Sequence, residues 1–68
     1  MLAAIMVDNW KLPIFRKELD KAEYEYTEHD GPTHKITTMK VEYKYALKLK
    51  KVVQSANDKA AISRITMH

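Results

Sequence analysis

The side chains best suited to chemistry gather in residues 28–34, Glu-His-Asp-Gly-Pro-Thr-His, which hold two of the three histidines and the single glycine. Imidazole and carboxylate groups are ligands for transition metals, so this segment is a candidate metal site. However, Asp30 followed by Gly31-Pro32 is typical of a turn. Apart from His68, no second cluster offers further ligands. We therefore expect a connecting turn without metal or cofactor, and whether His29 and His34 bind a metal stays open.

Nucleophilic catalysis has few candidates in this chain. Ser55 and Ser63 have no histidine near them in sequence, although folding can bring His29 or His34 close. A hydrolytic centre needs a nucleophile, a base and an orienting group in contact. A chain of 68 residues also leaves little room for a cleft. An enzyme is therefore our third hypothesis, with its active site built between subunits, and no catalytic residue is assigned.

Phosphate binding is the third kind of chemistry to consider. A single glycine excludes the Gly-rich phosphate loops. Lys44, Lys48 and Lys51 are candidate contacts for nucleic-acid phosphates, although they also fit the solvated side of a helix. Sheets that bind RNA stack bases on exposed aromatic residues. We expect charged residues instead on the exposed face of the third strand, and we expect the other face to hold Tyr24, Tyr26 and Tyr43.

Composition limits the class of protein. The chain has no cysteine, which excludes disulfides and fits a reducing compartment, so we expect a cytoplasmic protein. The apolar start ends at Asp8, too early for a signal peptide or a membrane span, so we expect no membrane partner. Residues 1–34 carry four Lys/Arg against seven Asp/Glu, a net −3, whereas residues 35–68 carry eight against two, a net +6. Opposite charges on the two halves favour contacts within or between copies.

The elements that position these residues follow from hydrophobic spacing. The apolar run at residues 3–7 predicts a strand. Asp8-Asn9 can cap the helix that follows it. Helical spacing of Leu12, Phe15, Leu19 and Ala22 predicts a helix over residues 11–22. Alternation predicts strands at residues 24–28 and 39–44, joined as a hairpin. The residues with helical spacing after this hairpin predict a second helix over residues 45–65; they are Tyr45, Leu49, Val52, Val53, Ala56 and Ala60.

Two helices over one face of a three-stranded, mainly antiparallel sheet is the simplest solution for this β-α-β-β-α order. The third strand is expected in the centre, and the first at an edge. This is the ferredoxin-like split βαβ arrangement, in the α+β class, without its last strand. Residues 1–68 then form one small domain. Leu47, Ile62 and Ile65 project away from the main face of the second helix, which indicates either another contact or a frayed tail at residues 62–68.

Three segments of the chain are distinctive: residues 7–15 (Val-Asp-Asn-Trp-Lys-Leu-Pro-Ile-Phe), Tyr24-Glu25-Tyr26 and residues 53–57 (Val-Gln-Ser-Ala-Asn). Through them the chain resembles short uncharacterised open reading frames of bacteriophages. The resemblance covers most of the chain through packing and capping residues. It implies a small protein of a phage or mobile element, and it carries no activity. Because small chains in that setting often act by binding a host protein or a small molecule, the resemblance implies the same expectation for this chain.

Our leading hypothesis is a non-enzymatic binding module that self-associates through the edge of its first strand. A domain of this size has a marginal core and gains from a partner. We expect subunit contacts at Ile5, Val7, Leu47, Ile62 and Ile65. Trp10, a residue type common at binding hot spots, is the candidate for a partner or ligand, although it can instead cover the end of the core. The alternative is a nucleic-acid-associated protein that uses the basic second helix.

Overall fold

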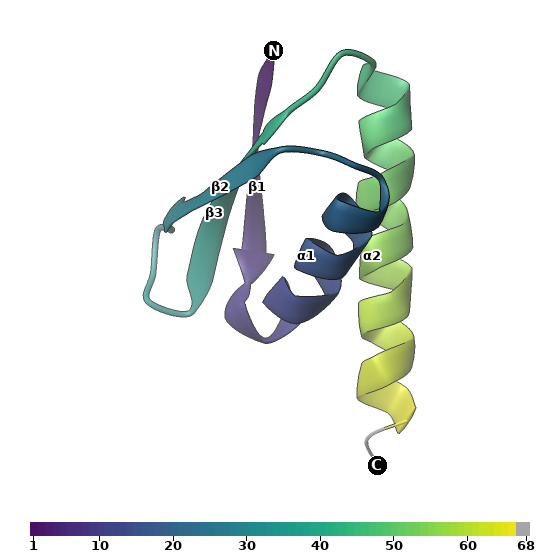
Figure 1. Cartoon of the computed structure of the whole chain (residues 1–68). Coiled ribbons are helices and arrows are strands. Elements are labelled where there is room, and N and C mark those ends of the chain that lie inside the picture. Colours follow the sequence, from purple (N-terminus) through teal and green to yellow (C-terminus); the bar gives the residue numbers. More distant parts are fainter. Residues whose placement is uncertain (67–68) are drawn as a thin grey trace.

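The computed structural model describes the backbone of residues 1–66 and the side-chain environment of residues 1–62. Figure 1 shows both helices on one side of a small sheet. The elements follow one another as strand β1 (Leu2–Asp8), 3-10 helix η1 (Asn9–Lys11), helix α1 (Leu12–Lys21), strands β2 (Tyr26–Asp30) and β3 (Ile36–Glu42), and helix α2 (Ala46–Thr66). No helix in this described part has the length and apolarity to span a membrane.

Strand β3 lies in the centre of the sheet, antiparallel to β1 on one side and to β2 on the other. Met39 pairs with Ile5 of β1 and with Glu28 of β2, which fixes the register across the sheet. The predicted α+β class and the three-stranded antiparallel sheet with two helices are therefore confirmed. Strand β1 forms one edge of the sheet and β2 the other.

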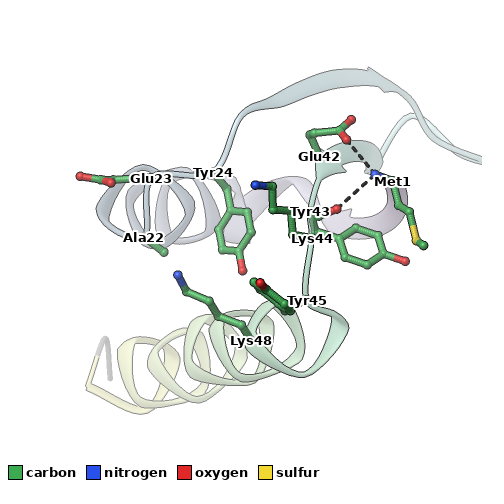
Figure 2. Close-up of a pocket in the computed structure, with 9 residues that line it drawn as sticks. All are labelled: Met1, Ala22, Glu23, Tyr24, Glu42, Tyr43, Lys44, Tyr45 and Lys48. Carbon is green, nitrogen blue, oxygen red and sulfur yellow. Dashed lines mark hydrogen bonds and ion pairs between the residues drawn. The ribbon is translucent and has the colours of Figure 1, made fainter.

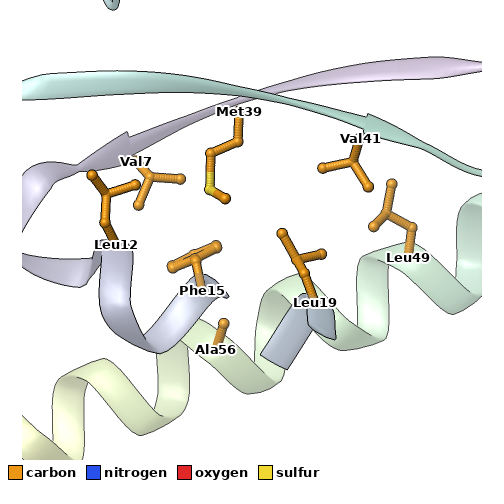
Figure 3. Packing of buried hydrophobic residues seen from close by; sticks show 8 residues of the cluster. All are labelled: Val7, Leu12, Phe15, Leu19, Met39, Val41, Leu49 and Ala56. Atoms are coloured by element: carbon orange, nitrogen blue, oxygen red, sulfur yellow. The ribbon is translucent and has the colours of Figure 1, made fainter. Parts of the chain in front are cut away.

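The core lies between the sheet and the helices (Figure 3). Met39 and Val41 of β3 are fully enclosed, and Phe15 and Leu19 of α1 pack beneath them. The predicted apolar face of α1 is confirmed, because Leu12, Phe15 and Leu19 are all buried. Helix α2 contributes the buried residues Leu49, Ala56 and Ala60, with Val52 and Val53 partly buried.

Tyr45 differs from its expected place on the buried face of the second helix. It precedes α2, and its carbonyl accepts the hydrogen bond from the Leu49 N–H at 3.2 Å. The backbone of a residue directly before a helix is not helical, so the Tyr45 side chain does not continue the buried face of α2. Its side chain is 70% exposed.

The hairpin begins later than its sequence pattern indicates. Glu28, His29 and Asp30 belong to β2, so the connection is only the segment between Asp30 and Ile36. A Cβ atom on Gly31 would lie 2.1 Å from the Ile36 carbonyl oxygen, which leaves no space for any other residue. The loop is closed by a hydrogen bond from the Ile36 N–H to the Thr33 carbonyl at 3.2 Å. Gly31 is therefore required by a close backbone approach within the turn.

Candidate functional site

A groove with a volume of about 530 Å³ opens where the ends of α1 and β3 meet the start of α2 (Figure 2). Tyrosine and lysine side chains make up most of its walls. Its lining residues are Met1, Ala22, Glu23, Tyr24, Glu42, Tyr43, Lys44, Tyr45 and Lys48.

The end of α1 places Tyr24 in this groove. The Tyr24 N–H donates to the Leu19 carbonyl at 2.9 Å, and the Glu23 N–H donates to the Asp20 carbonyl at 3.0 Å. This pair of hydrogen bonds is a Schellman motif, which reverses the chain directly after the helix. Glu23 has a φ of 63° at the left-handed position, where glycine is usual. The chain thus adopts a strained conformation at the residue that sets the direction of Tyr24.

The connection from β3 to α2 supplies the opposite wall. The Tyr43 N–H donates to the Met1 carbonyl at 2.8 Å, so the β1–β3 ladder extends to the rim of the groove. Tyr45 follows with an exposed ring, and Lys48 lies in the first turn of α2. In Figure 2 the Lys44 and Lys48 side chains extend toward the Tyr24 side of the groove.

The groove has an excess of unpaired positive charge. Among the described residues, neither Lys44 nor Lys48 forms an ion pair with a carboxylate. Glu42 accepts from the Met1 amine at 2.7 Å, so its charge is already compensated. The Glu23 carboxylate is directed away from the other lining side chains (Figure 2). An anion would therefore meet two available ammonium groups in the groove.

Two ion pairs elsewhere hold the elements together. Glu18 of α1 is only 6% exposed, and its carboxylate accepts from Lys59 of α2 and from the Ser55 hydroxyl at 3.4 Å. The hydrogen bond from Lys59 is the main cause of the lowered pKa of Glu18. Ser55 therefore donates to a carboxylate that stays ionised, and this contact does not activate it as a nucleophile.

The second ion pair joins α1 to β2. Arg16 donates from Nε and Nη2 to the two carboxylate oxygens of Glu28, at 2.8 and 2.7 Å. These hydrogen bonds are the main cause of the lowered pKa of Glu28, and the positive charge of Arg16 lowers it further. Glu28 is thereby used in a structural contact with α1 rather than available beside His29.

The histidines are separated by the hairpin. His29 Nε2 lies 2.7 Å from the Thr27 hydroxyl, whereas the His34 carbonyl accepts from the Asn9 side-chain amide at 2.9 Å. Within the described residues, no three His, Cys, Asp or Glu side chains gather in a way that would hold a metal ion. Ser63 and His68 lie outside the residues whose side chains are described.

The candidate lysines divide into two groups. Lys44 and Lys48 line the groove, whereas Lys51 is exposed one turn further along α2 and does not line it. Trp10, in η1, is 46% exposed, with the Lys11 Nζ 5.3 Å from its ring centroid. Trp10 is not among the residues that line the groove. The sequence pattern identified the two lysines but not the exposed tyrosine between them.

The side chains that β1 exposes to solvent are not Ile5 and Val7, the two residues expected at a subunit contact. Val7 is 2% exposed and Ile5 packs against the core, so both side chains face the helices. The opposite face of β1 carries Leu2 and Met6, which are 66% and 68% exposed, with exposed Ala4 between them. On α2, Leu47 is 75% and Ile62 is 61% exposed, and the side chain of Ile65 lies outside the described residues.

Comparison of the chain with protein-family models, with curated proteins and with solved structures finds no match.

Proposed function

We propose that this chain is a small binding module that self-associates by pairing β1 with β1 of a second copy. The single observation that carries this proposal is the chemistry of the two sheet edges. The edge strand β2 has the charged or polar residues Glu28, His29 and Asp30. The edge strand β1 has no charged side chain from Leu2 to Val7 and no proline. Charges and proline are the usual protection of an edge, so β1 is the edge suited to pairing.

The hydrogen-bond phase of β1 supports this pairing. The bonds from Tyr43 N–H to the Met1 carbonyl and from Asn9 N–H to the Lys35 carbonyl place the odd-numbered residues of β1 in the ladder with β3. In an antiparallel pair the hydrogen-bonded positions alternate. The backbone N–H and C=O groups of Leu2, Ala4 and Met6 therefore point to the open edge.

An antiparallel pairing centred on Ala4 suits this phase. It places Leu2 of each copy opposite Met6 of the other, with the two Ala4 residues facing each other. The exposed side chains of these residues then form one apolar cluster across the two-fold axis, on the open face of the sheet. The pairing is self-complementary, as a two-fold interface requires.

The proposed β1 pairing also bears on whether the fold is a ferredoxin-like split βαβ arrangement. A ferredoxin-like split βαβ arrangement would have a fourth strand beside β1, and we propose that the second copy takes that place. We further propose, from the resemblance to phage reading frames, that the module acts in the cytoplasm and binds a host protein or a small molecule.

Light scattering coupled to size-exclusion chromatography tests the pairing. We expect the wild-type chain to elute at twice its mass of 8.0 kDa at micromolar concentration. Ala4→Pro removes an outward N–H that the β1–β3 ladder does not use, and proline is tolerated on an edge strand. We expect this variant to be folded and monomeric.

Ala4→Val is the matched control, because valine keeps the N–H and favours a strand. It should elute with the wild type. A wild-type chain that stays monomeric at high micromolar concentration, or an Ala4→Pro variant that remains dimeric, would overturn the proposed pairing.

A further inference from the structure

We propose that the groove at the start of α2 binds a nucleotide unit, with its phosphate at Lys44 and Lys48 and its base against the ring of Tyr45. The nucleotide can be free or belong to the end of a single-stranded nucleic acid. Met1, next to the start of β1, lines the groove, but none of the residues of the proposed β1 pairing (Leu2, Ala4 and Met6) does, so this inference does not depend on that pairing.

The positive charges of the groove favour a phosphate. Lys44 and Lys48 come from two successive segments, and both line the same hollow. Within the described part of the chain neither forms an ion pair, while the nearby Glu42 is compensated by the Met1 amine. A phosphate would form charge-assisted hydrogen bonds with these ammonium groups without displacing an existing partner.

The aromatic residues of the groove favour a planar group next to that phosphate. Tyr45 exposes 70% of its surface, more than is usual for tyrosine, a residue type of intermediate burial. Tyr24 packs against the core, which holds its ring in place as a fixed wall. Binding of single strands without strong sequence preference combines such rings with basic side chains, because every base has a face that can stack.

The dimensions of the groove fit one such unit. Small-molecule sites have volumes of roughly 300 to 1,000 Å³, and this groove has about 530 Å³. The open face of the sheet is a poorer platform, because its central strand presents Lys40 and Glu42 rather than aromatic side chains. The aromatic residues that the sheet face lacks are therefore found at the groove, beside two of the candidate lysines.

Titration of the full chain, followed by NMR of its backbone amides, tests this inference. The probes are adenosine monophosphate, a short single-stranded oligo(dT), and inorganic phosphate. We expect the amide signals of Tyr45 and Lys48 to shift with the nucleotide or with the oligonucleotide, at lower concentrations than with phosphate. Shifts with the mononucleotide alone would indicate a free nucleotide, and shifts with the oligonucleotide alone would indicate a single strand. No shift with either probe, or equal affinity for inorganic phosphate, would overturn the inference.

Substitutions distinguish binding in the groove from binding to the basic surface of α2 in general. Tyr45→Ala removes an exposed ring without altering the core, and we expect it to weaken binding about tenfold or more. The double variant Lys44→Met/Lys48→Met should weaken binding and reduce its dependence on salt concentration.

The double variant Lys50→Met/Lys51→Met is the matched control, because it removes the same charge from exposed positions outside the groove. It should bind like the wild type. Equal weakening by both double variants would show that the phosphate meets the helix as a whole, and it would overturn the assignment to the groove. Circular dichroism of each variant verifies that it is folded.

Discussion

The two leucines near the start of α2 provide a sharp test of the packing. Leu49 is 6% exposed and lies in the core, whereas Leu47, two residues earlier on the same helix, is 75% exposed. Substitution of either by alanine removes the same atoms and changes helix propensity equally. Any difference between the two variants must therefore come from burial.

The magnitude of the difference follows from these exposures. Leu49→Ala loses the transfer free energy of a buried side chain and leaves a cavity, which destabilises by about 2 to 5 kcal/mol. We expect the lower part of this range, because Leu49 lies at one end of a small core. The free energy of unfolding for 68 residues is on the order of 3 to 10 kcal/mol. Leu47→Ala should change it by less than about 0.5 kcal/mol.

Urea denaturation monitored by far-UV circular dichroism measures both variants. With a slope of about 1 kcal/mol per molar urea, Leu49→Ala should lower the midpoint by roughly 2 M or more. Equal losses for the two variants would refute the assignment of the buried face of α2. A loss for Leu47→Ala that grows with protein concentration would instead place Leu47 in a contact between subunits.

Three further predictions concern the turn, the end of α1 and the response to acid. Gly31→Ala should destabilise the fold by about 1 to 3 kcal/mol, because its Cβ would lie 2.1 Å from the carbonyl oxygen of Ile36; a urea midpoint equal to that of the wild type would contradict this close approach. Glu23→Gly should stabilise the fold by up to about 1 kcal/mol, since glycine accepts a positive φ without strain. Calorimetry measures the melting temperature of this variant, and a value below that of the wild type would contradict the prediction. The pKa values of Glu18 and Glu28 are lowered in the folded chain, chiefly by hydrogen bonds from their basic partners. Their contribution to stability is present above their ordinary pKa of 4.5 and is lost as the pH falls through the lower folded values. Urea midpoints measured from pH 7 downward should therefore drop in acid, and less steeply in Glu18→Gln and Glu28→Gln; parallel curves would contradict the pairing.

Much of the architecture follows from local patterns in the sequence. The spacing of Leu12, Phe15 and Leu19 determines the buried face of α1, because a helix repeats every 3.6 residues whatever it packs against. The alternation around Met39 and Val41 similarly predicts a half-buried strand. Gly31-Pro32 predicted the hairpin, although the structure extends β2 to Asp30, beyond the expected strand end at Glu28, and begins β3 at Ile36 rather than at Met39.

Other features depend on contacts between distant parts of the chain. Strand β1 is apolar on both faces, so its alternation is invisible in the sequence, and only pairing with β3 decided that Ile5 and Val7 face the core while Leu2 and Met6 face outward.

The groove is likewise decided by tertiary structure. It gathers the end of α1, the end of β3 and the first turn of α2, and the Schellman motif directs Tyr24 toward Lys44 and Lys48. A pattern read along the chain determines which residues are buried within one element. It does not determine which element ends meet, because that depends on how the helices cross the sheet.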